Sequence, residues 1–190
     1  MVPFVIEKTS HGDQGFDIYS RLLRDRIIFI GGEINNELAT SVIAQILFLQ
    51  MENKEEDIHL YIMSGGGCVS SGLAIYDTIQ YVSNDISTLA VGEACSMGAF
   101  LLASGTKGKR AVLPSTRVMI HQPYGGTEGD STTIEIQAKE MKRLSTMLAE
   151  RLAKHTGQTI KKIKRDIQED YFMDAEEAVK YGLVDKVLHG

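Results

Sequence analysis

A serine between small residues is the first candidate for chemistry in this sequence. Ser96 lies between Ala94 and Gly98, where an apolar strand pattern passes into an apolar helix pattern. A nucleophilic serine on a sharp strand-to-helix turn needs small residues at these spacings, because larger side chains would clash with the neighbouring backbone. The amide of Met97 would lie near the hydroxyl and stabilise an oxyanion. Close packing of a structural turn explains the same pattern, so the motif alone leaves both interpretations open.

A nucleophilic serine needs a base, and His121 is the best placed of the five histidines. It ends the apolar pattern of residues 118–120 and precedes a turn rich in proline and glycine, which predicts a position at the carboxyl edge of a sheet. A histidine bonded by loop carbonyls remains the structural alternative. The other four have structural explanations at a terminus, in a strand or at a helix end: His11, His59, His155 and His189.

A third group, usually a carboxylate, must orient the imidazole of such a base and stabilise its charged form. Among the 25 acidic residues, Asp170 stands where a helix pattern ends and an aromatic, apolar segment begins, so we expect it to be partly buried. Position alone does not separate it from the other acids.

A glycine-rich loop is expected at residues 64–67, after an apolar strand pattern. It lacks the lysine and Ser/Thr of a P-loop and the spacing of the dinucleotide fingerprint, so phosphate binding is not expected. Its glycines would instead let a backbone amide approach a substrate carbonyl as a second oxyanion donor beside Met97.

The elements that must position these residues alternate along the chain. Strand patterns occupy residues 26–32, 58–63 and 86–91, and helix patterns lie at residues 38–47, 73–82 and 97–103. Fully apolar strands alternating with helices predict an α/β fold with a mostly parallel, buried sheet. Short strands are expected near residues 111–112 and 118–120, and a last strand at residues 183–188.

Two further helices follow the sheet pattern. A long amphipathic helix is predicted from Thr133 to Lys154, and it either packs against another subunit or covers the core. The last helix is predicted to begin after Asp174, with Glu177 completing a capping box, and to end at Gly182.

Composition places bounds on the function. A chain of 190 residues with 43% hydrophobic and 24% charged residues predicts one domain, residues 1–190. A net charge of -5 disfavours nucleic-acid partners, and no apolar run has the roughly 18 residues that a membrane helix requires. Cys68 and Cys95 lack the spacing of metal ligands or of a disulfide framework, which suits a reducing cytoplasm.

Several ordered motifs together resemble the ClpP family, the proteolytic subunits of the ATP-dependent Clp protease, over nearly the whole chain. This family has a crotonase-like core and belongs to peptidase family S14. The motifs that carry the resemblance are residues 19–23, 25–29, 72–78, 96–99, 121–123, 125–126, 177–178 and 181–185. The resemblance implies a serine-type, ATP-dependent endopeptidase that cleaves unfolded polypeptides.

The resemblance also implies a role for each site residue. Ser96 would be the nucleophile, His121 the general base and then acid, and Asp170 the orienting carboxylate. Gly67 and Met97 would supply the oxyanion amides. The substrate would bind as an added strand along Cys68, Val69, Gln122, Pro123, Tyr124 and Gly125. No cofactor is implied, because ATP binds the partner.

The resemblance further implies an assembly. A strand-helix handle, about residues 122–155, would protrude from the core and join two heptameric rings into a tetradecamer. Residues 1–18 would form an N-terminal loop at an axial pore. A hexameric Clp AAA+ unfoldase would dock near Leu22, Leu23, Tyr61 and Tyr81. The expected location is the cytoplasm of a bacterial type of cell, with no nucleic-acid or membrane partner.

A few residues depart from the family pattern. Gly65 replaces a proline, which raises the entropic cost of ordering the glycine loop. Glu93 and Cys95 replace glutamine and alanine, and Gln168 and Glu169 stand where many members carry a ring-bridging acidic-basic pair. One alternative is therefore a poorly active structural or regulatory ring subunit that pairs with a second ClpP. Another is a crotonase-type acyl-CoA enzyme on the same fold.

Overall fold

The computed structural model describes residues 2–9 and 12–189. The helices are α1 (Ile18–Arg24), α2 (Asn36–Glu52), α3 (Val69–Tyr81), α4 (Met97–Ala103), α5 (Ser131–Thr156), α6 (Ile160–Asp166) and α7 (Ala175–Tyr181). The strands are β1 (Phe4–Thr9), β2 (Gly12–Asp17), β3 (Ile27–Ile34), β4 (Ile58–Gly67), β5 (Ile86–Cys95), β6 (Arg110–Val112), β7 (Arg117–Ile120), β8 (Tyr171–Met173) and β9 (Lys186–Val187).

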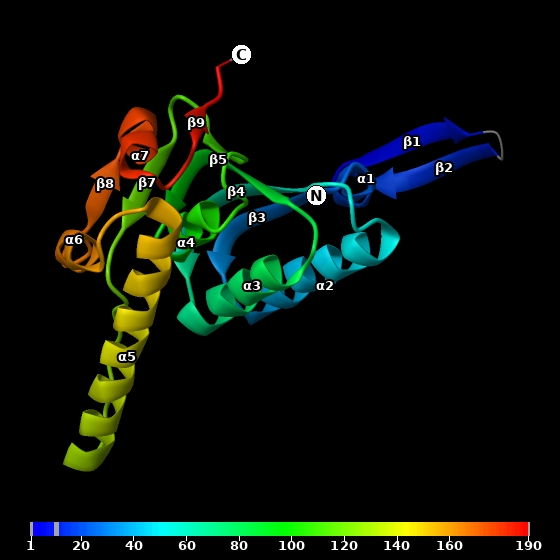
Figure 1. Cartoon of the computed structure of the whole chain (residues 1–190). Coiled ribbons are helices and arrows are strands. Elements are labelled where there is room, and N and C mark those ends of the chain that lie inside the picture. Colours follow the sequence, from blue (N-terminus) through cyan, green and yellow to red (C-terminus); the bar gives the residue numbers. More distant parts are fainter. Residues whose placement is uncertain (1, 10–11, 190) are drawn as a thin grey trace.

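A seven-stranded sheet forms the centre of the molecule and confirms the predicted α/β class (Figure 1). Its main path is β3-β4-β5-β6-β9, and β7 pairs with both β5 and β8. The strand pairs are parallel except for β7 with β8. A parallel sheet needs crossover helices, and the alternation of strands and helices along the chain provides them.

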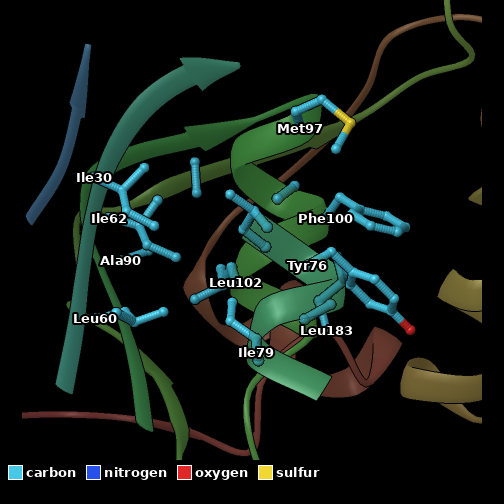
Figure 2. Packing of buried hydrophobic residues seen from close by; sticks show 14 of the residues in the cluster. Ile30, Leu60, Ile62, Tyr76, Ile79, Ala90, Met97, Phe100, Leu102 and Leu183 are labelled. Carbon is cyan, nitrogen blue, oxygen red and sulfur yellow. The ribbon is translucent and has the colours of Figure 1, made fainter. Parts of the chain in front are cut away.

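The core lies between this sheet and helices α3 and α4 (Figure 2). Ile30 and Ile62 are fully buried on the strand side, Leu102 of α4 lies between the helix and the strands, and Phe100 packs against Tyr76 of α3 on the other side of α4. All seven residues of α4 are buried, which explains why its sequence is apolar throughout. Since α4 begins directly after Ser96, its burial anchors that residue in the core.

Strand β4 is longer than its apolar pattern predicted. Residues 64–67, expected as a loop, continue the strand, and Gly66 and Gly67 pair with Glu33 and Ile34 of β3. A Cβ atom on Gly67 would lie 2.3 Å from the carbonyl oxygen of Ile34, so the pairing requires glycine there. The predicted glycine loop is therefore an extension of the sheet.

The last strand is shorter than predicted. Residues 183–188 were expected to be extended, but β9 covers Lys186–Val187 alone. Leu183 and Val184 are buried directly after Gly182, whose left-handed backbone ends α7. The chain turns into the core at this point before it reaches the sheet. The capping box of Asp174 and Glu177 is confirmed.

The amino-terminal segment forms a hairpin rather than the loop expected over residues 1–18. Strands β1 and β2 pair antiparallel from Phe4 with Asp17 to Thr9 with Gly12, and the hairpin extends away from the body (Figure 1). Residues 1, 10 and 11, and with them His11, lie outside the described residues. The carboxylate of Asp17 then caps α1 by accepting from the amides of Tyr19 and Ser20.

Helix α5 projects from the body at the far side from the hairpin (Figure 1). Its 26 residues span about 39 Å, and its buried residues, Leu148, Ala149, Leu152 and Ala153, all lie near its carboxyl end. The strand of the predicted strand-helix handle is absent, because the described residues 121–130 have no strand pairing. This segment contains Pro123 and three glycines, which do not favour a strand without a partner edge. No helix in the described ranges is long and apolar enough to cross a membrane.

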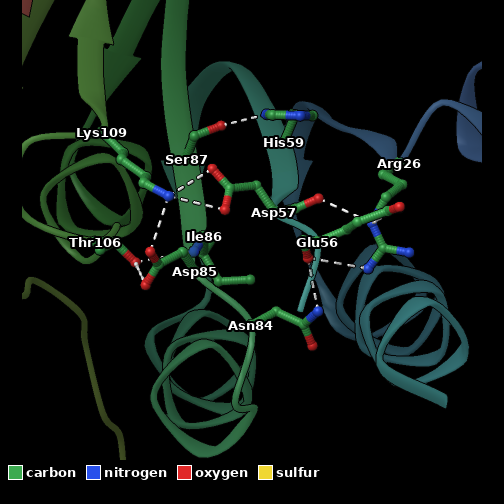
Figure 3. Close-up of polar contacts among 10 residues, drawn as sticks. All are labelled: Arg26, Glu56, Asp57, His59, Asn84, Asp85, Ile86, Ser87, Thr106 and Lys109. Atoms are coloured by element: carbon green, nitrogen blue, oxygen red, sulfur yellow. Dashed lines mark hydrogen bonds and ion pairs between the residues drawn. The ribbon is translucent and has the colours of Figure 1, made fainter. Parts of the chain in front are cut away.

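Ion pairs and hydrogen bonds stabilise the amino ends of β4 and β5 (Figure 3). The Lys109 ammonium lies 2.7 Å from a carboxylate oxygen of Asp57 and 2.8 Å from one of Asp85. The buried guanidinium of Arg26 donates to backbone carbonyls of Leu49, Asn53, Glu56 and Asp57. These contacts lie at the sheet end opposite Ser96, so they stabilise the scaffold and leave the serine edge open.

The Arg110–Asp185 ion pair gives a test of how β6 and the carboxyl-terminal segment are joined. Arg110 Nη2 lies 2.7 Å from Asp185 Oδ1, and Arg110 is 3% exposed. Burial alone would raise the pKa of Asp185, but hydrogen bonds from the side chain and amide of Arg110 outweigh it and lower the pKa. The folded carboxylate is therefore stabilised above its unfolded pKa of about 3.9 and loses this contribution as pH falls through the lower, folded value.

We predict that Asp185→Asn lowers the free energy of unfolding at pH 7 by about 3 kcal/mol, because it leaves a buried guanidinium unpaired. Urea unfolding measures the loss, and the difference from the native chain should shrink below about pH 4. Glu140→Gln, which removes an exposed ion pair with Arg143, is the control and should change little. An equal effect of the two variants would contradict the assignment.

Candidate active site

Ser96 occupies a strained backbone position between β5 and α4. Its φ is 53°, a left-handed value that non-glycine residues rarely adopt. Its amide donates to the carbonyl of Met119, and its own carbonyl accepts from the amide of Phe100. The small residues around it are used for close packing, since a Cβ on Gly98 would lie 2.7 Å from the carbonyl oxygen of Ser64. The turn is fixed at both ends by the sheet and by the buried helix.

Three polar side chains meet at the carboxyl end of the sheet. Ser96 Oγ lies 2.9 Å from His121 Nε2, and His121 Nδ1 lies 2.9 Å from Asp170 Oδ1. His121 follows β7 directly, and Asp170 directly precedes β8. The sheet thus brings together three residues that are far apart in the sequence.

Strand register accounts for this meeting. In the parallel pair β5–β7, Cys95 lies opposite Met119, so the residues after these strands lie close together. In the antiparallel pair β7–β8, Ile120 lies opposite Tyr171, which sets His121 opposite the residue before β8. A slip of one residue in either pair would break the hydrogen-bonded chain.

The exposure of Asp170 differs from the sequence prediction. Its side chain is 58% exposed, whereas that of His121 is 15% exposed, so the expected partial burial of the acid is wrong. The cause is that β8 has three residues and pairs with β7 alone, which leaves the residue before it open to solvent. The carboxylate is held by its single contact with the imidazole and by the fold of the segment. The backbone amide of Gln122 donates to the carbonyl of Ile167 at 2.7 Å, which holds the segment before Asp170 next to the residues after β7.

Two backbone amides near Ser96 are left over by the regular hydrogen bonding of α4 and of the β3–β4 pair. Met97 is the first residue of α4, so its amide has no partner within the helix. At the edge of β4, the carbonyl of Ile34 accepts from Cys68 rather than from Gly67. The parallel ladder therefore turns the Gly67 amide away from β3. Gly67 and Ser96 line one cavity of about 250 Å³.

The structure places part of the expected substrate edge in this cavity. Its lining residues are Glu33, Gly65, Gly67, Val69, Ser96, His121, Pro123 and Tyr124. The ring of Tyr124 stands edge-on to His121, with ring centroids 5.5 Å apart. Glu33 and Gly65 were not among the predicted substrate contacts. Glu33 lies in this cavity because of the register between β3 and the glycine segment of β4. The sequence does not reveal that register.

The remaining expected substrate contacts lie outside the cavity. Cys68 lines a separate groove between α3 and α5. Gln122 lines a neighbouring depression with Asp170. Gly125 faces the side chain of Met141. The depression that Gln122 lines shares Gly65, His121 and Tyr124 with the cavity of Ser96.

The residues expected to dock an unfoldase lie on three elements, α1, β4 and α3. Tyr61 stacks on Phe29 on the sheet face away from α3, whereas Tyr81 ends α3 with 80% of its surface exposed. Leu22 and Leu23 lie on α1. None of Leu22, Leu23 and Tyr81 lines the cavity that contains Tyr61 in the described part of the chain.

The two thiols have opposite properties. Cys95 is buried beside Ser96, and burial, with Glu93 and Asp170 nearby, raises its pKa. Cys68 is exposed, and hydrogen bonds from the Ser70 hydroxyl and the Ser71 amide lower its pKa to about 7. The thiol next to the serine is therefore a poor competing nucleophile, because the thiolate is the reactive form.

This arrangement has the parts that acyl transfer requires: a hydroxyl nucleophile, a base that touches it, a carboxylate on the far ring nitrogen and amides for an oxyanion. Comparison with known families points the same way. Residues 10–190 match the family model described as Clp protease.

Gly66 offers a direct test of the serine geometry. Its φ is +103°, and a Cβ there would lie 2.6 Å from Ser96 Cβ and 2.8 Å from the Cys95 carbonyl oxygen. We predict that Gly66→Ala slows fluorophosphonate labelling of Ser96 on the order of 100-fold, because the serine must shift away from its oxyanion amides. Gly65→Ala is the matched control, since its Cβ would meet nothing nearer than 3.8 Å. Equal labelling of both variants would contradict this account.

Cys68 gives a second test. We predict that the iodoacetamide rate of the native chain rises with pH around a midpoint of about 7, because the exposed thiol becomes a thiolate there. Ser70→Ala removes the main hydrogen bond and should move the midpoint upward. The rate should vanish in Cys68→Ser, since Cys95 is buried. A midpoint near 9 in the native chain would refute the assigned hydrogen bonds.

Proposed function

Because the chain belongs to the Clp protease family, we propose that it is a serine peptidase subunit in which Ser96, His121 and Asp170 hydrolyse peptide bonds. The observation that carries the proposal is the hydrogen-bonded chain from Ser96 Oγ through both nitrogens of His121 to Asp170. Membership of the family establishes a Clp-type peptidase. The serine mechanism and the roles of these residues are our proposal.

In the proposed reaction, Ser96 Oγ attacks the scissile carbonyl carbon while His121 Nε2 takes the hydroxyl proton. The amides of Gly67 and Met97 bind the oxyanion of the tetrahedral intermediate. The C–N bond then breaks, and His121 passes the proton to the leaving amine. Water, deprotonated by His121, hydrolyses the acyl ester on Ser96. Asp170 holds Nδ1–H and stabilises the imidazolium. The cycle uses side chains and amides alone, so we propose that this subunit needs no cofactor.

We further propose the family's assembly for this chain: heptameric rings that stack through α5, with β1 and β2 at the axial pore and a Clp AAA+ unfoldase that delivers unfolded polypeptides. Exposed apolar residues support it. Ile134 and Ile136 on α5 are 45% and 59% exposed, which is costly for a helix that stays in water. The free cysteines, Cys68 and Cys95, suit a cytoplasmic location.

A second candidate is a ring subunit that is poorly active without a paralogue. The exposure of Asp170 favours it, because water competes for the hydrogen bond that orients His121. In this alternative, contact with a second ring would cover Asp170 and order residues 122–130. An acyl-CoA enzyme of the crotonase type is less well supported, since that chemistry does not use a hydrogen-bonded serine, histidine and aspartate.

The experiment that tests the function is intact-mass analysis after treatment with a serine-directed fluorophosphonate. We expect one adduct on the native chain and none on Ser96→Ala, with peptide cleavage reduced at least about 10³-fold in that variant. Ser70→Ala is the control and should keep the adduct, because Ser70 touches neither His121 nor Asp170. If the native chain forms no adduct alone but does so with a second subunit, the paralogue alternative holds. No adduct in any assembly would overturn the proposal.

A further inference from the structure

The charge of the Ser96 cavity points to the substrates that it accepts. We propose that Glu33 is a specificity residue that selects peptides with a lysine or arginine side chain close to the scissile bond. This inference rests on the proposed peptidase function and adds a substrate class to it.

The first step is the direction of the Glu33 side chain. Glu33 of β3 pairs in register with Gly66 of β4, and paired residues of neighbouring strands direct their side chains to the same face. The Cβ direction of Gly66 is known from its neighbour, since a Cβ built there would lie 2.6 Å from Ser96 Cβ. Glu33 therefore lies beside the Ser96 turn, and its exposed side chain lines the cavity there. Its neighbour Ile34 is fully buried in the core.

The second step is the absence of side chains between the acid and the serine. The strand between them carries glycine at residues 65–67, so backbone alone separates the two. Adjacent strands lie about 4.8 Å apart, so Glu33 on β3 and the turn after β5 are two spacings, roughly 10 Å, apart across glycines that leave the space between them open. Glu33 and Ser96 accordingly line the same cavity of about 250 Å³.

The third step is the charge balance of the cavity. Glu33 is the one carboxylate among its lining residues, and neither lysine nor arginine lines it. Across the residues that the structure describes, Glu33 makes no ion pair with another residue. Glu93 is also acidic and close, but it lies opposite Arg117 in the β5–β7 register and does not line the cavity. A cation on the substrate is thus the natural partner of Glu33.

The expected preference is moderate. Ion pairs that keep contact with solvent contribute up to about 1 kcal/mol, which corresponds to about fivefold in kcat/KM. An acidic side chain at the same substrate position should be disfavoured by repulsion. The preference should weaken as salt is added, because exposed charges are screened. The peptide's own amino terminus is a second source of positive charge, and the test must separate it from the side chain.

The test uses the full chain in the assembly that it forms and a peptide whose cleavage site has been mapped by mass spectrometry. Lysine, glutamine or glutamate is placed in turn at three positions on each side of that site, with the amino terminus acetylated. We expect at least one position where kcat/KM falls from lysine to glutamine to glutamate, by about fivefold at each step. Repeating the lysine and glutamine peptides without acetylation shows whether the amino terminus is the cation that binds.

Variants assign the preference to Glu33. Glu33→Gln should bring the lysine-to-glutamine ratio close to one, and Glu33→Lys should favour the glutamate peptide. Glu93→Gln, the matched acidic control, should keep the native ratio. Equal rates for all peptides, or a ratio that falls equally in Glu93→Gln, would overturn this inference alone. A preference that follows the free amino terminus only would also overturn it. If no peptide is cleaved and Ser96 takes no fluorophosphonate, the proposed function itself fails.

Discussion

The close contact between the glycine end of β4 and the turn at Ser96 governs the geometry of the site. Gly66 leaves no space for a side chain beside Ser96, and Gly67 leaves none beside Ile34. The serine is pressed between a paired strand and a helix that is buried along its whole length. This packing supports the strained φ of Ser96, which a solvent-exposed turn would relax. The core thus stabilises the one backbone conformation that directs the hydroxyl toward His121.

Register carries this geometry to the rest of the site. Pairing with β5 sets the position of β7, and pairing with β7 sets the position of β8. Backbone hydrogen bonds, rather than their own side chains, therefore place His121 and Asp170. The side chains of Ser96 and His121 are partly buried, whereas that of Asp170, in the segment farthest along this series of pairings, is 58% exposed. A site built in this order has a rigid nucleophile and an orienting acid that its surroundings can tune.

Two elements that extend beyond the core, the amino-terminal hairpin and α5, both expose apolar side chains. The hairpin of β1 and β2 exposes Phe4 and Ile6, and the outer half of α5 exposes Ile134 and Ile136. Both elements are held by local hydrogen bonds and extend away from the body (Figure 1). The Ser96 site and this exposed apolar surface are thus separated in space. This separation lets a ring form without disturbing the serine turn.

Much of this protein was determined by its sequence alone. Apolar strand patterns that alternate with helix patterns require a parallel sheet, and the small residues beside Ser96 mark a turn with close packing. Local context singled out His121, and the family resemblance named Asp170, since position alone does not distinguish Asp170 from the other acids. Tertiary structure decided the remainder. Strand pairing and register decide three features: the glycine end of β4 is a strand, Asp170 is exposed, and Glu33 lies at the Ser96 cavity. The sequence does not show these features, because long-range pairing leaves no periodicity in the residues that it joins.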